Sequence, residues 1–298
     1  CPQELVDFET VLKKDLAKAG NEKRFAKDKK FWDDQLDALG EPLYSDIQGP
    51  SVLEGARKRH GDPKLRASDI EMNELFVAVK DYHLEPYATQ NLMDFCMNHQ
   101  LSMTNLLLLG IRTYLSKVNN GQEDITIQNF ISRRSTHDEW TSGGSRTIMF
   151  PCRTVISPET DFLSAAYEIQ NMQNRIYMHS NYDPALIVDE MRKRYHTPEH
   201  TSYESCYLTY QPMPVKVENE MLGTVRQHAK WFANGAATKK MYLTVSHTED
   251  GGMNFSYHYQ TAHLEEHDME LLYYYMMRIL FKGIAEPDMS IGEIMEQV

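Results

Sequence analysis

Four arginines stand in or beside two neighbouring β-type segments, and their type and spacing are the first sign of chemistry in this sequence. The segments are ITIQNFISR and RTIMFPCRTVI, joined within residues 121–156 by a polar connection that contains two glycines. The arginines are Arg133, Arg134, Arg146 and Arg153. A simply buried strand would carry apolar side chains at such positions, whereas a guanidinium is a planar fork that binds carboxylate or phosphate groups. The arginines therefore meet either an anionic ligand or buried carboxylates, and the carboxylate is the stronger alternative for Arg134 and Arg153.

Two copies of the pattern H-x-x-E-H place histidines four residues apart, a spacing that binds zinc when both rings share one helix face. They are HTPEH, with His196, Glu199 and His200, and HLEEH, with His263, Glu266 and His267. Pro198 disfavours a continuous helix through the first copy, and neither copy has an evident third ligand. We interpret both as surface histidines at helix ends and expect no metal site. A zinc hydrolase would rest on HLEEH alone.

His179 lies between an amphipathic helical pattern and the segment NYDPALI, which starts the next helix. A histidine at such a junction is usually structural, and we expect a backbone carbonyl to bind its ring. The chain contains no G-x-S-x-G, P-loop or G-x-G-x-x-G motif, and we assign no catalytic residue to it.

The bulk composition excludes several classes of function. The chain has 298 residues, a net charge of −12 and 41% hydrophobic residues. This charge disfavours nucleic acid and anionic membranes as partners, and the lysine-rich run KKDLAKAGNEKRFAKDKK also contains acids and is typical of a solvated helix face. Four cysteines without a C-x-x-C pair indicate buried free thiols in a reducing cytoplasm, namely Cys1, Cys96, Cys152 and Cys206. No apolar run is long enough to span a bilayer, and we expect a cytoplasmic piece of a longer chain.

Periodicity predicts six strands and six principal helices in an α/β arrangement, with a mixed sheet covered by helices. The predicted strands are 71–84, 125–133, 146–156, 205–212, 239–250 and 253–260, the last two forming a hairpin. The predicted helices are 22–39, 85–98, 103–118 with Ser102 as N-cap, 161–180, 184–195 and 265–284. We expect 40–70 to be a connector without regular structure. The expected domains are a helical lead-in and linker at 1–66 and one lobe at 67–298.

An ordered series of segments resembles the C-terminal lobe of a condensation domain of non-ribosomal peptide synthetases, in the chloramphenicol-acetyltransferase-like superfamily. LVDFETV (5–11) resembles the segment that follows the first lobe, and RFAKDKKFWDDQL is similar to the linker helix of the family. The run LSMTNLLLLGIRTYLSKVNNGQEDITIQNFISRR, which ends at Arg134, is similar to a helix–strand unit of the family. YLTVSHTEDGGMNFSYHY resembles its closing hairpin.

Two segments depart from the family pattern while keeping part of it. GGSRTIMFPCR stands where the family has G-x-F-V-N-T-x-x-x-R, so that Gly144 and Arg153 match. The Phe-Val-Asn-Thr core is replaced by Arg146, Thr147, Ile148 and Met149. HSNYDPALI falls at the H-Q-x-x-P-F-E segment and keeps His179, with the proline displaced to Pro184. The first departure raises the alternative that this member is specialised or inactive.

The resemblance implies one lobe of a chloramphenicol-acetyltransferase-like fold and a role in amide-bond formation between acyl groups on the phosphopantetheine arms of carrier proteins. The family signature H-H-x-x-x-D-G belongs to the first lobe and is absent from this chain, so we expect the chain to be inactive alone. The implied channel wall contains Gln128, Asn129, Ser145 and Arg146, and the implied supporting residues are Arg134, Arg153 and His179. No cofactor is expected to bind directly.

The implied partners are the N-terminal lobe, peptidyl carrier proteins and an adenylation domain. Carrier proteins are acidic, so we expect them to dock on local basic sites such as residues 192–194 (RKR) and 239–240 (KK). Two alternatives stay open within the same fold. One is another thioester-dependent acyltransferase of the superfamily, and the other is a non-catalytic lobe that docks partner domains.

Overall fold

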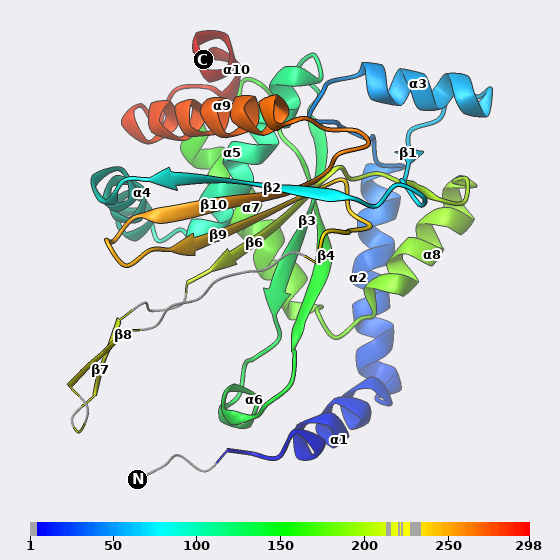
Figure 1. The fold of residues 1–298 in the computed structure, drawn as a ribbon. Helices are drawn as coiled ribbons and strands as arrows, with labels where there is room; N and C mark the ends of the chain where they lie inside the picture. Colours follow the sequence, from blue (N-terminus) through cyan, green and yellow to red (C-terminus); the bar gives the residue numbers. More distant parts are fainter. Residues whose placement is uncertain (1–4, 213–215, 220, 222, 227–233) are drawn as a thin grey trace.

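A mixed six-stranded β-sheet forms the centre of the molecule (Figure 1). This computed structural model describes residues 5–212, 216–219, 221, 223–226 and 234–298. The strand order is β2–β10–β9–β6–β3–β4; β3, β6 and β9 are parallel, and the other neighbours are antiparallel. The strands are β2 (Val77–Leu84), β3 (Asp124–Ser132), β4 (Thr147–Val155), β6 (Cys206–Gln211), β9 (Met241–His247) and β10 (Met253–Gln260). All six predicted strands, the β9–β10 hairpin and the α/β class are confirmed.

Helices α5, α7 and α9 cover one face of this sheet (Figure 1). Together with two helices packed at their ends, they are α4 (Pro86–Asn98), α5 (Met103–Val118), α7 (Phe162–Met178), α9 (Glu266–Ala285) and α10 (Ile291–Gln297). The Ser102 hydroxyl caps α5 as predicted, accepting a hydrogen bond from the backbone N–H of Asn105 at 3.2 Å. Gly110 lets α5 and α9 approach closely, because a Cβ atom there would lie 3.0 Å from side-chain atoms of Leu280 and Met276.

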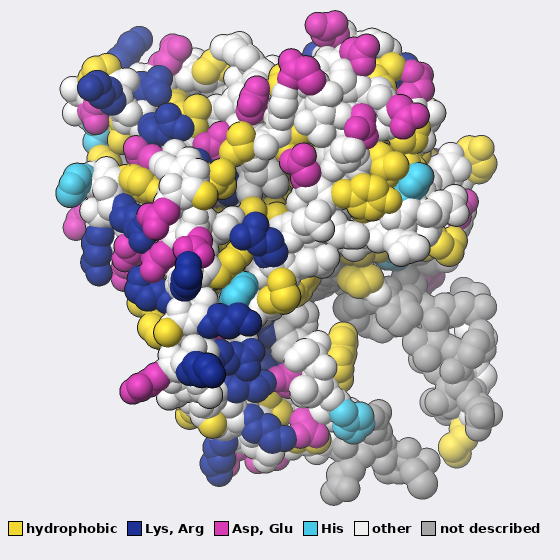
Figure 2. Space-filling model, turned by 180° about the vertical axis from the view of Figure 1, so that it is seen from behind, with side chains coloured by type: hydrophobic (Ala, Val, Ile, Leu, Met, Phe, Trp, Pro, Cys, Tyr) yellow, Lys and Arg dark blue, Asp and Glu magenta, His cyan; other side chains and the backbone are white. Residues whose placement is uncertain are grey.

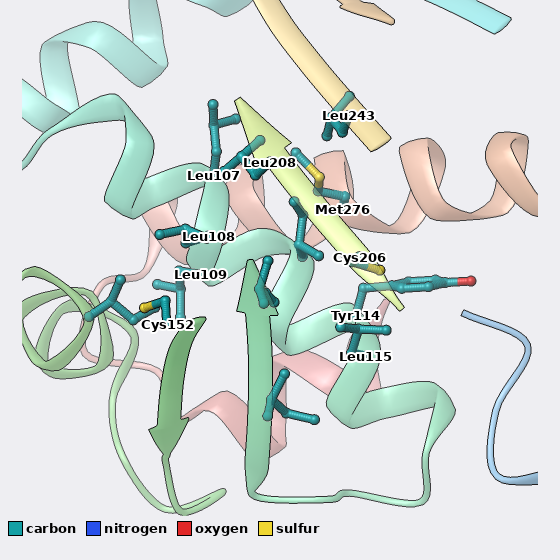
Figure 3. Close-up of a cluster of buried hydrophobic side chains, with 14 of the residues drawn as sticks. Leu107, Leu108, Leu109, Tyr114, Leu115, Cys152, Cys206, Leu208, Leu243 and Met276 are labelled. Atoms are coloured by element: carbon teal, nitrogen blue, oxygen red, sulfur yellow. The ribbon is translucent and has the colours of Figure 1, made fainter. Parts of the chain in front are cut away.

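The hydrophobic core lies between α5 and the sheet (Figure 3). Side chains of α5 meet Leu208 of β6, Leu243 of β9 and Met276 of α9 in one buried cluster. The residues predicted to face inward are all buried: Phe162, Ala166, Ile169 and Ile176 of α7, and Met269, Leu272, Met276, Ile279 and Leu280 of α9. The prediction succeeded because an apolar stripe with the helical period of 3.6 residues can bury itself on only one face.

Helices α1 (Phe8–Ala19), α2 (Glu22–Leu39) and α8 (Pro184–Tyr195) lie on the β4 side of the sheet (Figure 1). α2 ends at Gly40 as predicted and contributes Phe31, Trp32 and Leu36 to the core that the lobe itself forms. The Trp32 ring stacks on Phe150 of β4 with ring centroids 5.6 Å apart. The lead-in and the lobe thus share one core, and the domain boundary at residue 66 stays a prediction.

The sequence did not predict several short elements. They are α3 (Ser51–His60), α6 (His137–Thr141), α10 and two small two-stranded sheets, β1 (Ser68–Asp69) with β5 (Thr201–Ser202) and β7 (Lys216–Asn219) with β8 (Gly223–Arg226). The expectation of an irregular connector at 40–70 was wrong, because α3 forms within it. α3 buries only Leu53 and Ala56, so its sequence has too few apolar positions to display a helical period.

Cys96, Cys152 and Cys206 are buried free thiols, as predicted for them, and Cys1 lies outside the described residues. Burial raises the pKa of all three thiols, to about 12 for Cys96 and Cys206 and to about 11 for Cys152. In the described part of the chain no helix combines the length and the apolar character that crossing a bilayer requires.

The α7–α9 contact provides a test of this packing. A Cβ atom at Gly283 of α9 would lie 2.3 Å from the buried ring of Phe162, so Gly283→Ala should lower the free energy of unfolding by about 1–3 kcal/mol through overpacking. Gly55 of α3 is a matched helical control, because its added Cβ would meet only the end of the flexible Arg59 side chain, at 3.2 Å. Gly55→Ala should be neutral or stabilising by up to about 1 kcal/mol. Urea unfolding of both variants checks the difference, and a stable Gly283→Ala would contradict the packing.

Candidate functional site

The candidate site is the β3–β4 hairpin together with the sheet face that α5, α7 and α9 leave uncovered. β3 and β4 pair along their whole length, from Asp124 opposite Val155 to Ser132 opposite Thr147. The hairpin runs beyond the other strands and ends in α6 (Figure 1). Its tip is a capping box: the Thr136 hydroxyl accepts from the backbone N–H of Glu139, and the Glu139 carboxylate accepts from the N–H of Thr136.

Polar side chains line the uncovered sheet face, because alternate residues of a strand point to opposite sides. The strand registers bring together on this face Gln128 of β3, Tyr207 and Thr209 of β6, Tyr242 and Thr244 of β9, and Ser256 and His258 of β10. The Tyr242 hydroxyl lies 2.7 Å from that of Thr209, and its ring meets the Phe130 ring edge-on at 5.2 Å. Burial lowers the pKa of His258. The face is therefore polar but ordered by its own contacts.

Gln128 and Asn129, both predicted to line a channel, point to opposite sides of the sheet. The Gln128 amide donates to the Glu204 carboxylate at 3.0 Å on the uncovered face. Asn129 is only 1% exposed and donates to the side chain of Gln173 in α7 at 2.8 Å. The placement of Asn129 beside Gln128 is thus corrected, since consecutive strand residues cannot line the same surface.

Ser145 is exposed in the turn that leads into β4. The preceding Gly144 has φ of 82°, and a Cβ atom there would lie 2.4 Å from the Phe8 ring of α1. Both the positive φ and the ring require glycine at this position. The backbone N–H of Val6 also donates to the Thr141 carbonyl at 3.2 Å. The hairpin tip therefore lies directly against the start of α1.

Arg146 lies at the centre of a buried ionic cluster, not on an open surface. Its guanidinium contacts the Asp15 carboxylate at 2.6 Å and the Glu139 carboxylate at 3.2 Å. The side chains of Arg146 and Glu139 are 4% and 5% exposed. Lys18 of α1 also binds Glu139, at 3.0 Å. In this conformation Arg146 joins α1 to the hairpin, and a role on a channel wall stays a prediction.

The cluster strongly favours the ionised carboxylates. The hydrogen bond from Arg146 lowers the pKa of Asp15 and, in return, raises the pKa of Arg146. Burial alone would raise the pKa of Glu139, but hydrogen bonds from Ser135, Lys18 and Thr136 outweigh it and hold this pKa well below its usual range. Lys and Arg side chains also gather over α1 and α2 in the lower part of the space-filling view (Figure 2).

Arg134 and Arg153 both bind inside the protein, with different partners. Arg134 donates to the carbonyls of Glu139, Ser142 and Gly144 and so holds the hairpin tip from within; these backbone acceptors stand where we expected a carboxylate. Arg153 forms a two-pronged pair with Asp124 at 2.7 Å for each bond. It also donates to the carbonyls of Leu39, Gly40 and Glu41, at 3.0, 2.6 and 3.2 Å. Arg153 thus satisfies carbonyls that the end of α2 leaves free.

His179 is bound by a carboxylate rather than by the expected backbone carbonyl. Its Nδ1 atom lies 2.8 Å from Oδ1 of Asp28 in α2, and Asp28 is buried. The imidazole stacks on the Phe31 ring, with centroids 4.2 Å apart. Asp28 and Asp15 were missed because both occur in the lysine-rich run that we interpreted as a solvated face. The one signal for Glu139 was its position three residues after Thr136.

The two H-x-x-E-H motifs do not form a zinc-binding helix. His196 and His200 have positive φ angles of 51° and 59°, so the first copy is not helical. His263 contacts Glu71 at 3.2 Å, and His267 contacts Glu270 at 3.3 Å. Throughout the described ranges no group of three or more His, Cys, Asp or Glu side chains is arranged to hold a metal ion.

A mixed sheet with helices on one face and a polar opposite face defines the fold class of one condensation-type lobe. The condensation domain family matches residues 6–296, and the chain belongs to this family. A plipastatin synthase polypeptide of Bacillus subtilis (strain 168) is 20% identical over 273 residues, which are 91% of this chain and 10% of that protein. The surfactin synthase subunit 1 of the same organism is 21% identical over 274 residues, or 91% of this chain and 7% of that protein.

Two solved structures show the same fold. The first condensation domain of the calcium-dependent antibiotic synthetase matches with a TM-score of 0.73 and 14% identity, over 98% of this chain and 58% of that chain. The X-domain in its complex with OxyB from teicoplanin biosynthesis matches with a TM-score of 0.65 and 14% identity, over 95% of this chain and 58% of that chain. The chain thus spans less than two thirds of these structures and a tenth or less of the two curated relatives.

The ionic cluster predicts unequal effects of removing its cations. Arg146→Met should lower the free energy of unfolding by about 3–5 kcal/mol, because it leaves the buried Glu139 carboxylate without its guanidinium. Lys14→Met is the control: it removes an exposed ion pair with Asp138 on the same two elements and should cost less than about 1 kcal/mol. Urea unfolding measures both, and equal losses would contradict the central position of Arg146.

The same cluster predicts a pH dependence. The pKa values of Asp15 and Glu139 are lower in the folded protein, so their contribution is fully present above the unfolded pKa of about 4 and is lost as the pH falls below it. The stability difference between the unsubstituted protein and Glu139→Gln should therefore be largest near neutral pH and shrink between about pH 4 and pH 2. Unfolding at several pH values checks this; a difference independent of pH would contradict it.

Proposed function

We propose that this chain is the C-terminal lobe of a non-ribosomal peptide synthetase condensation domain, which forms amide bonds together with an N-terminal lobe. The observation that carries the proposal is the uncovered polar sheet face beside the β3–β4 hairpin, in a chain that the condensation family matches over residues 6–296. A face of this kind fits a second lobe that encloses polar substrates between the two halves.

Exposed apolar side chains on α1 support the same partner. Leu5, Phe8, Leu12 and Leu16 follow the helical period and are all exposed. An exposed apolar stripe of this kind marks an interaction surface. Because α1 lies beside the hairpin tip, a lobe that covers the stripe would also reach the hairpin. We assign the stripe to the N-terminal lobe.

In the proposed reaction the amine of the acceptor attacks the thioester carbonyl of the donor. A C–N bond forms, the C–S bond breaks, and the amine loses a proton while the phosphopantetheine thiol of the donor carrier is released. The sequence contains no H-H-x-x-x-D-G signature, so the histidine that positions or accepts the proton comes from the other lobe. This chain supplies the wall: Gln128, held by Glu204, donates or accepts hydrogen bonds along the channel, and the ionic cluster fixes the hairpin.

Carrier proteins and an adenylation domain are the proposed partners of the complete enzyme. Of the predicted basic docking residues, Arg194 binds Asp33 and Glu190, and Lys240 binds the buried Asp46. Arg192 and Lys193 are exposed. We therefore propose that Arg192 and Lys193, at the end of α8, meet an acidic carrier surface more readily than the 239–240 pair.

A non-catalytic docking lobe is the second candidate. Arg146 stands where the family pattern has an apolar residue and is committed to the ionic cluster. The X-domain of teicoplanin biosynthesis, which has this fold, was solved in complex with OxyB, so a condensation-type fold can serve as a docking platform. Another thioester-dependent acyltransferase of the superfamily remains the third candidate.

The proposed function predicts that the chain gains activity only with a partner lobe. The coding sequence upstream of Cys1 should contain the H-H-x-x-x-D-G signature. The joined protein, given an acyl-loaded donor carrier and an aminoacyl-loaded acceptor carrier, should form an amide product that mass spectrometry detects. The 298-residue chain alone should form none. Alanine in place of the second signature histidine is the control and should abolish the product. No product from a well-folded joined protein would contradict catalysis and favour the docking lobe.

A further inference from the structure

A pocket between α2, α8 and the β3–β4 pair lies outside the site described above. It encloses about 450 Å³ of free space, its open mouth included. Its apolar wall contains Leu36 and Leu39 of α2, Pro151 of β4, Met172 of α7, and Ile187 and Met191 of α8. We call this the α2–α8 pocket. Its apolar lining suits the carbon skeleton of a small molecule.

Two polar residues of the pocket wall are buried without a hydrogen-bond partner. Trp32 is 5% exposed and Thr126 is 2% exposed. Among the residues that the structure describes, the indole Nε1 of Trp32 and the Oγ1 of Thr126 have no partner. An indole N–H can only donate, and a hydroxyl can donate or accept. Unpaired buried polar groups are rare in native proteins and call for a specific explanation. Both groups would be satisfied by an acceptor atom on a molecule in the pocket.

The charged residues at the pocket are already neutralised. Arg153 binds Asp124 and three backbone carbonyls. The Glu204 carboxylate accepts hydrogen bonds from Gln128 at 3.0 Å and from Ser202 at 2.6 Å. Both side chains are therefore occupied by partners within the protein, and an unpaired charge in an apolar pocket is costly. The occupant must therefore be neutral.

We propose that the α2–α8 pocket binds a small neutral molecule with an apolar body and one carbonyl-type acceptor, which Trp32 Nε1–H and Thr126 Oγ1–H recognise. Ketones, primary amides and esters of short acyl chains belong to this class. The site is separate from amide-bond formation and does not depend on it. Because Thr126 and Pro151 lie on the two strands of the hairpin, an occupant would contact both strands and α2 at once.

The test uses hexanamide as probe on the 298-residue chain. Hexanamide should bind and shift the indole N–H resonance of Trp32 in NMR spectra; the chain has three tryptophans, and loss of one signal in Trp32→Phe assigns it. Hexanoate and hexylammonium have the same chain length but carry a charge, and should bind at least about tenfold more weakly. Binding of hexanoate as strong as that of hexanamide, or no shift with hexanamide, would overturn the proposal.

Variants separate the pocket from nonspecific binding. Leu39→Trp fills the pocket mouth at a partly exposed position and should abolish the saturable binding of hexanamide. Leu16→Trp introduces the same side chain on the exposed face of α1 and should leave it unchanged. Thr126→Val keeps the shape, removes one donor and should weaken binding about three- to tenfold. It should also unfold at a temperature no lower than the unsubstituted protein, because the lost hydroxyl has no partner. Saturable binding that persists in Leu39→Trp, or unchanged affinity in Thr126→Val, would refute the assignment.

Discussion

The structure depends on one constraint: a long hairpin that runs beyond its sheet must be fixed without a hydrophobic layer around it. Buried arginines meet this constraint at three levels of the hairpin. Arg153 joins its base to the end of α2, Arg134 holds the backbone of its tip, and Arg146 joins the tip to α1. Each guanidinium is surrounded by fixed acceptors, so its charge is compensated where a lone buried charge would be costly.

The rest of the lobe follows from the division of the sheet into two unlike faces. α5 is buried on nearly every side and fills the space between the sheet and α9, and this makes one face a conventional core. The other face carries hydroxyl, amide and imidazole groups that are ordered by contacts such as Gln128 with Glu204. An ordered polar face is costly to maintain for a protein that only needs to fold, and this asymmetry is the physical basis of the assignment to a two-lobe enzyme.

The sequence predicted the regular elements well and the contacts poorly. Helical stripes such as Met269–Leu272–Met276 and alternation in MNFSYHYQ depend only on local period, so they could be read directly. The resemblance to condensation domains is likewise confirmed by the family match. The partners of Arg146 and His179 lie 131 and 151 residues away in the chain, and no local pattern contains such distances. The small helix α3 was missed because its few buried residues leave no period to detect.

The seating of Phe8 on Gly144 has a mechanical consequence. Together with the ionic bonds from α1 to Glu139, it makes the first helix and the distal hairpin a single lever. Any force applied to the apolar side of that helix is transmitted to the turn that starts β4, without an intervening flexible joint. A companion that grips the helix would therefore set the angle of the hairpin as well, and alignment of the two halves of a reaction chamber would be achieved by one grip instead of two.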